Sequence, residues 1–136
     1  MSKEHTDHDP LNVTLNIEGR DYQLHLPNLQ TANVGNHTLY LAAVADCQVA
    51  AFEPNPALVQ AIETSRALNQ LDGQIEVFAA GVGAQSGYAQ FDYLDEHNLG
   101  AQRLALSGEE QGALPVITLD EQTWAQPVKV IKVDVE

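Results

Sequence analysis

Apolar and polar residues alternate strictly in two short runs near the start of the chain. Glu18 and Gly19 separate the two runs, and Pro27 follows the second one. Alternation with a period of two on both sides of a glycine-containing turn predicts a β-hairpin. The apolar positions of the two runs are Leu11, Val13, Leu15, Ile17, Tyr22, Leu24 and Leu26.

The centre of the chain predicts a strand, a helix and a second strand. The apolar run VAAFE (49–53) is typical of a buried parallel strand. Asn55 and Pro56 then predict a helix start, because Asn caps helices well and Pro suits the first helical position. The helical apolar stripe continues to about residue 71, and IEVFAAGVG (75–83) predicts the second strand. This order indicates a βαβ unit with a parallel sheet, so the expected fold class is α/β.

Further elements are expected on either side of this unit. Small apolar residues after Gly35 predict a helix, and GYAQFDYL (87–94) predicts an antiparallel or edge strand. LPVITL (114–119) predicts a short strand, whereas residues 97–113 have no regular pattern. VKVIKVDVE (128–136) predicts a strong strand with no helix after it. We therefore expect an incomplete parallel sheet in which this last strand is a potential open edge.

The length and composition indicate one globular domain. The chain has 136 residues, and 44% of them are hydrophobic, which argues against global disorder. Residues 1–10 are polar and are expected to form a flexible tail, with residues 11–136 as a single partial domain. The tail lacks the apolar core of a signal peptide, and no apolar run reaches the ~18 residues of a membrane helix. These observations predict a cytoplasmic protein.

The charge balance excludes two classes of partner. Nineteen acidic and six basic residues leave 13 net negative charges at neutral pH (19 − 6 = 13). Such a chain is unsuited to the phosphates of a nucleic acid and to an anionic membrane surface, so neither is expected. Cys47 is the single cysteine, which excludes an internal disulfide and a thiolate zinc cluster, and no metal site is predicted.

Glu53 is the most informative candidate for ligand binding. Ligands of open α/β sheets bind at the carboxyl ends of the strands, and Glu53 ends the first strand of the βαβ unit. It lies 18 residues after Gly35 (53 − 35 = 18), close to the ~20 residues expected for an acidic side chain that binds ribose hydroxyls. The alternative is a strand-end carboxylate that contacts only water. The segment around Gly35 lacks a complete G-x-G-x-x-G, which argues against a nicotinamide or flavin dinucleotide.

Several strings occur together in the order and spacing of a known family. They are NVGNHTLYLA, VAAFEPNP, ALNQL, HNLG, VITLDE and VIKVDVE. Over about residues 32–136 this set resembles the FkbM family of S-adenosylmethionine-dependent methyltransferases. The resemblance implies a Rossmann-like methyltransferase fold and S-adenosylmethionine as cofactor. It also implies methyl transfer to a small-molecule hydroxyl acceptor, often a sugar or a natural product.

The resemblance also implies roles for individual residues. Glu53 would hold the cofactor ribose, Asn55 would support that turn, and Asp134 would face the methyl-transfer centre. The remaining cofactor-binding residues lie in the loop before the first helix or near the adenine, and are Asn33, Gly35, Asn36, His37, Ala80 and Gly81.

Other interpretations of these residues stay open. Gly35 also suits a plain turn at a helix start, and His37 suits either a helix cap or a catalytic base. Asp134 shares a strand face with Lys132, so it is a candidate base, substrate ligand or ion-pair partner. Trp124 is interpreted as a core or edge anchor, with a ligand platform as the alternative.

The sequence departs from the family pattern at both ends of the match. The family opens with Asp-x-Gly-Ala-Asn, whereas Leu29 and Thr31 occupy the acidic and glycine positions here. The family also continues beyond VDVE with a glycine, a helix and further strands. These departures motivate an alternative hypothesis of a non-catalytic, truncated remnant that self-associates through the strand at 128–136.

Overall fold

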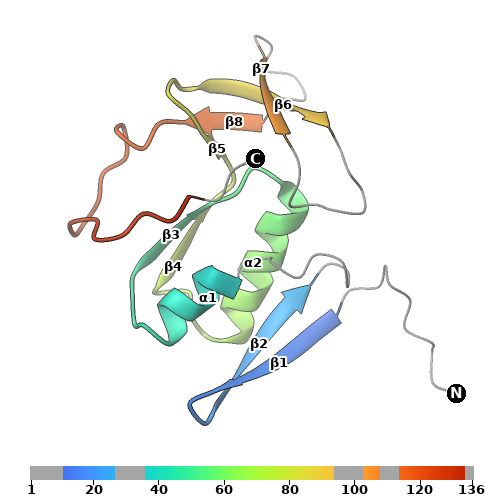
Figure 1. Ribbon diagram of the computed structural model, residues 1–136, viewed down its shortest axis with the longest axis vertical. Coiled ribbons are helices and arrows are strands. Elements are labelled where there is room, and N and C mark those ends of the chain that lie inside the picture. Colours follow the sequence, from blue (N-terminus) through green and yellow to red (C-terminus); the bar gives the residue numbers. More distant parts are fainter. Residues whose placement is uncertain (1–10, 27–35, 94–102, 108–113, 134–136) are drawn as a thin grey trace, which may run out of the picture.

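A computed structural model describes residues 11–26, 36–93, 103–107 and 114–133 of the chain (Figure 1). Its elements mix helices and strands along the chain, which confirms the α/β class, although the strands divide among three small sheets. The predicted tail at residues 1–10 lies outside the described residues. The elements are β1 (Leu11–Ile17), β2 (Arg20–Leu26), α1 (Asn36–Ala43), β3 (Val49–Phe52), α2 (Pro56–Leu68), β4 (Ile75–Phe78), β5 (Gly81–Val82), β6 (Gly87–Tyr93), β7 (Arg103–Ser107) and β8 (Leu114–Ile117).

The predicted hairpin is confirmed. Strands β1 and β2 pair antiparallel, with Leu11 opposite Leu26 and Ile17 opposite Arg20. The two turn residues, Glu18 and Gly19, have positive φ angles of 50° and 82°. Positive φ at both central positions gives the turn a twist that matches the twist of the two strands.

The βαβ unit is also confirmed. Strands β3 and β4 pair in parallel, from Val49 opposite Ile75 to Phe52 opposite Phe78, and α2 connects them. The side chain of Asn55 accepts a hydrogen bond from the backbone amide of Ala57 at 2.9 Å. This bond satisfies one of the amides that the first turn of a helix leaves without an intrahelical partner.

Both helices cover one face of the β3–β4 pair. Val77 contacts the buried residues of α2 and also the cluster that α1 forms with β4. Because side chains alternate along a strand, Phe52 and Phe78 lie on the opposite face, together with the exposed Glu76. The hairpin lies on the far side of α2 from this sheet (Figure 1). The buried core residues of the helix-covered side are Leu39, Ala42, Leu58, Ala61, Ile62, Leu71 and Ile75.

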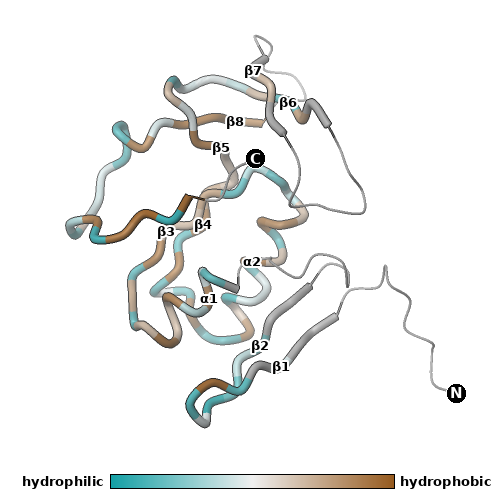
Figure 2. Tube along the Cα trace, viewed as in Figure 1, coloured by the Kyte–Doolittle hydropathy of each residue, from teal (hydrophilic) through white to brown (hydrophobic). Residues whose placement is uncertain are grey.

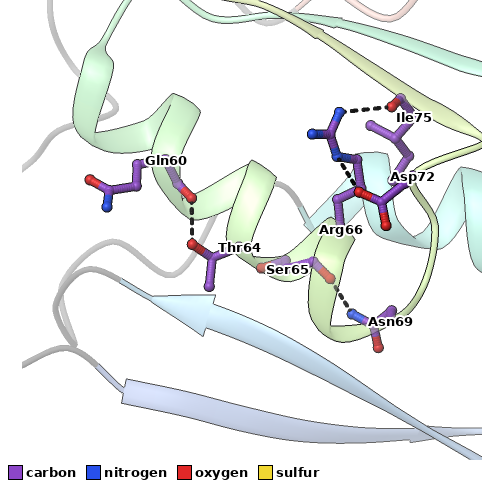
Figure 3. Close-up of polar contacts among 7 residues, drawn as sticks. All are labelled: Gln60, Thr64, Ser65, Arg66, Asn69, Asp72 and Ile75. Carbon is purple, nitrogen blue, oxygen red and sulfur yellow. Dashed lines mark hydrogen bonds and ion pairs between the residues drawn. The ribbon is translucent and has the colours of Figure 1, made fainter.

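Helix α2 ends at Leu68 and not near residue 71 as the apolar stripe predicts. Gln70 adopts a left-handed conformation with φ of 57°, which cannot continue the helix. The side-chain amide of Asn69 donates to the Ser65 carbonyl at 2.6 Å, which caps the last turn (Figure 3). Asn69 also donates to the Gln23 carbonyl at 2.6 Å and accepts from the Gln23 amide at 2.7 Å, which joins the hairpin to α2.

Arg66 holds the turn that leads from α2 into β4 (Figure 3). Its guanidinium donates to the Ile75 carbonyl at 3.2 Å and lies 3.5 Å from the exposed carboxylate of Asp72. The Asp72 carboxylate is largely exposed, so the ion pair contributes little to stability and the carbonyl contact is the more important of the two.

The second half of the chain differs from two sequence predictions. The expected single strand over 75–83 is broken, because Ala80 donates to the Phe78 carbonyl at 2.9 Å and turns the chain away. The short β5 then joins a different sheet of order β5-β8-β6-β7. Strand β7 pairs antiparallel with β6 within the segment 97–113, where no regular structure was predicted. The strands predicted over 87–94 and 114–119 are present as β6 and β8. Strand β6 is antiparallel to both of its neighbours and lies between β8 and β7, so the edge position considered for it is wrong.

The strand predicted over 128–136 is wrong for the part that the structure describes. Residues 128–133 form neither helix nor strand and are exposed, and residues 134–136 lie outside the described residues. The pattern gives this segment a high strand propensity, but a strand also needs a hydrogen-bonding neighbour, and none pairs with it among the described residues. Figure 2 shows its predominantly hydrophobic colouring. Val130, Ile131 and Val133 are 76%, 64% and 69% exposed.

Candidate functional site

Glu53 lies immediately after β3, at the carboxyl end of the parallel pair. Its backbone amide donates to the Phe78 carbonyl at 3.0 Å, so the ladder with β4 extends to this residue. The backbone amide of Asn55 donates to Oε1 of Glu53 at 2.8 Å. The sequence Glu-Pro-Asn-Pro therefore folds the carboxylate back onto the start of α2 and fixes its position.

Burial changes the acidity of this carboxyl group. Desolvation raises the pKa of Glu53 above its usual value, and the hydrogen bond from Asn55 opposes that rise. A carboxylate held partly out of water has a strong preference for hydrogen-bond donors, and each of its oxygens accepts more than one. The group therefore suits a ligand that brings a pair of hydroxyls.

Ala80 and Gly81 lie at the same end of the sheet as Glu53. The Phe78 carbonyl accepts from the amide of Ala80 at 2.9 Å as well as from the amide of Glu53. Ala80 and Gly81 are both buried. The structure thus brings together four of the predicted site residues, Glu53, Asn55, Ala80 and Gly81, around the ends of β3 and β4.

An aromatic cluster lies on the helix-free face beside this site. The Phe52 and Phe78 rings stack with centroids 4.6 Å apart and an interplanar angle of 10°. The Trp124 ring meets Phe52 edge-on, with centroids 6.2 Å apart and an angle of 82°. Sequence reasoning singled out Trp124 as an anchor but missed the two phenylalanines. The signal that could have found them is the parallel register of β3 and β4, which places Phe52 opposite Phe78.

Other predicted site residues are placed only in part. Asn33, Gly35 and Asp134 lie outside the described residues. Asn36 begins α1, but its side chain is not among those described. His37 is exposed in the first turn of α1 and interacts with another group of the protein.

Two negative observations apply to the described ranges 11–26, 36–93, 103–107 and 114–133. Within them, no three histidine, cysteine or acidic side chains gather closely enough to hold a metal ion. In the same residues, no helix has both the length and the apolar character to cross a membrane.

Comparison with known families shows which domain the chain resembles. Residues 31–136, which are most of the chain, match the model of the methyltransferase FkbM domain. Comparisons with curated proteins and with solved structures give no match.

Proposed function

The chain belongs to the FkbM methyltransferase family, and we propose that it binds S-adenosylmethionine and methylates a hydroxyl group of a small molecule. The observation that carries the proposal is the desolvated carboxylate of Glu53 at the end of a parallel strand. We also propose that β3, α2 and β4 are part of a Rossmann-like sheet, since that fold binds nucleosides at this position.

The described residues fit the nucleoside part of this cofactor. Glu53 accepts hydrogen bonds from the two ribose hydroxyls, and Asn55 holds the carboxylate in place through its backbone amide. Ala80 and Gly81 are small residues at the same end of the sheet, next to the proposed position of the base. The excess of 13 negative charges favours a cationic ligand in general terms.

Methyl transfer from this cofactor requires few catalytic side chains. The bound cofactor supplies a methyl group that its sulfonium has already activated, so the protein mainly aligns the acceptor with it. In this proposal Asp134 accepts the proton that the acceptor hydroxyl loses, since a nearby base assists oxygen acceptors. Sugars and hydroxylated natural products are the proposed acceptor class.

Calorimetric titration tests the cofactor part of the proposal. Titration of the unsubstituted chain with S-adenosylmethionine should give a heat of binding. Glu53→Ala should weaken the affinity about tenfold or more, because charge-assisted hydrogen bonds to the ribose are lost. Glu63→Ala is the matched control, because Glu63 is an exposed acid in the middle of α2, away from the strand ends. Equal affinities for the unsubstituted chain and Glu53→Ala would remove Glu53 from the site.

The acceptor class is tested with methyl-labelled cofactor. Label should move to hydroxylated sugars and not to analogues in which the hydroxyl is replaced by hydrogen. Transfer to amines alone would contradict methylation at oxygen.

A second candidate function is association without catalysis, and the exposure of residues 128–133 favours it. Contiguous exposed apolar side chains on a soluble protein mark interaction surfaces. This segment also carries two of the six basic residues, Lys129 and Lys132, on an otherwise strongly acidic chain, so a second copy attracts it electrostatically. Light scattering should show concentration-dependent dimers that Ile131→Asp weakens and Leu68→Asp does not. A monomer at high concentration would contradict association.

A further inference from the structure

Trp124 lies outside every segment that contributes to the site described above. It belongs to the stretch after β8, yet its ring meets Phe52, the residue that precedes Glu53. Phe52 in turn stacks on Phe78, whose carbonyl binds the amides of Glu53 and Ala80. One short path of contacts therefore connects Trp124 to the ends of both parallel strands.

The Trp124 ring is only partly covered. It is 36% exposed, and its plane stands nearly perpendicular to that of Phe52. A single perpendicular neighbour cannot cover both faces of an indole, so at least one face is not covered by Phe52. Exposed indole faces are favourable stacking surfaces for flat, weakly polar rings such as nucleobases.

The segment that carries Trp124 is tied to the body of the protein. The Ser86 hydroxyl donates to the carboxylate of Glu121, and this bond lowers the pKa of Glu121. The Gln122 amide group donates to the Thr118 carbonyl at 3.1 Å and holds the turn closed. Trp124 is therefore positioned by contacts on both sides: the turn that precedes it and the Phe52 ring that it meets.

We propose that Trp124 is the stacking residue for the adenine of the bound cofactor. The inference rests on the proposed function, because it takes the ribose to be held by Glu53. The base attached to that sugar would then extend over the end of β3 toward the face that carries Phe52 and Trp124. Trp124 would then bind the cofactor directly and would not serve only as a structural anchor.

The first test uses fluorescence, because Trp124 is the single tryptophan of the chain. Titration with S-adenosylmethionine or with adenosine should change the emission intensity of the unsubstituted chain, whereas methionine at the same concentrations should not. Unchanged emission under conditions where calorimetry shows cofactor binding would overturn the inference and leave the proposed function intact.

Three variants separate stacking from packing. Trp124→Leu fills space without an aromatic face and should weaken S-adenosylmethionine and adenosine binding roughly tenfold or more. Trp124→Phe should keep affinity within about threefold, since a smaller ring still stacks. Leu68→Ala, at the other end of α2 from Asn55, is the control for loss of an exposed apolar side chain and should bind normally.

The outcomes distinguish the two proposals. Normal affinity in Trp124→Leu overturns the stacking role alone. No binding of S-adenosylmethionine to the unsubstituted chain overturns the proposed function and the stacking role together. If Trp124→Leu fails to fold, the fluorescence titration of the unsubstituted chain decides the matter by itself.

Discussion

The backbone amide of Asn55 donates a 2.8 Å hydrogen bond to Oε1 of Glu53, two residues earlier in the chain. The same Asn55 uses its side chain to accept from the amide of Ala57 and so caps α2. One residue thus starts the helix and also orients the carboxylate that the proposed function depends on. Changes at either position are expected to affect both stability and binding.

Glu53→Gln should stabilise the protein at neutral pH. Burial raises the pKa of Glu53, so the folded protein favours the protonated carboxyl group. The resulting contribution to stability is present in full below the usual pKa of 4.5 and is lost as the pH rises through the raised pKa. A neutral amide of the same shape avoids this loss and should raise the thermal midpoint by a few degrees near pH 7.

The pH dependence provides the check on this prediction. Thermal unfolding of Glu53→Gln and the unsubstituted chain should converge as the pH falls below 4.5. Glu76→Gln, at an exposed position on the next strand, is the control. If the difference in thermal midpoint between Glu53→Gln and the unsubstituted chain grew toward acid pH, the pKa of Glu53 would be lowered and not raised.

Asn55→Ala should destabilise the protein by about 1 kcal/mol, because an amide in the first turn of α2 loses its acceptor. Asn55→Ser keeps a capping oxygen and should recover most of that loss. Urea unfolding of the two variants measures the difference. Equal stability of the alanine and serine variants would show that the buried Asn55 side chain acts by packing and not by capping.

Asn69→Ala should cost about 1–3 kcal/mol of unfolding free energy, because the hairpin loses both hydrogen bonds between Gln23 and the helix end. Asn16→Ala is the matched control in the same hairpin. It removes one exposed hydrogen bond to Asp21 and should stay within about 0.5 kcal/mol of the unsubstituted chain. Similar losses for the two variants would contradict a special role for Asn69.

Gly83→Ala should destabilise the sheet that contains β5. A β-carbon at Gly83 lies 2.9 Å from a methyl group of Val116, which is buried and cannot move aside freely. Overpacking of this kind costs about 1–3 kcal/mol. Gly73→Ala meets no atom within 4 Å and should be tolerated, so chemical unfolding of the two variants compares a crowded glycine with an open one.

The predictable parts of the fold are those set by local chemistry. The hairpin follows from alternation around Glu18 and Gly19, and α2 begins where Asn55 and Pro56 predict. The position of Glu53 at the carboxyl end of β3 also follows from the local sequence, whereas its role in binding stays a prediction. These features depend on neighbours within a few residues, which the sequence displays directly.

The parts that escaped prediction depend on contacts distant in sequence. Apart from Glu76 the run 75–83 holds only apolar residues and glycines, and only the pairing of β5 with β8 shows that it divides after Phe78. Residues 128–133 have the composition of a strand but no hydrogen-bonding neighbour among the described residues. Likewise, Trp124 meets Phe52 across 72 positions (124 − 52 = 72), which no local pattern indicates.

The central claim is that the carboxylate of Glu53 binds the cofactor ribose. The most direct test is the affinity for S-adenosylmethionine as a function of pH, measured by calorimetry for the unsubstituted chain and for Glu53→Gln. Ribose hydroxyls donate to the ionised carboxylate, so the affinity of the unsubstituted chain should fall as the pH drops through the raised pKa of Glu53. Glu53→Gln should bind more weakly near pH 7 and lack this fall. Equal affinities with parallel pH profiles for the two proteins would contradict the claim.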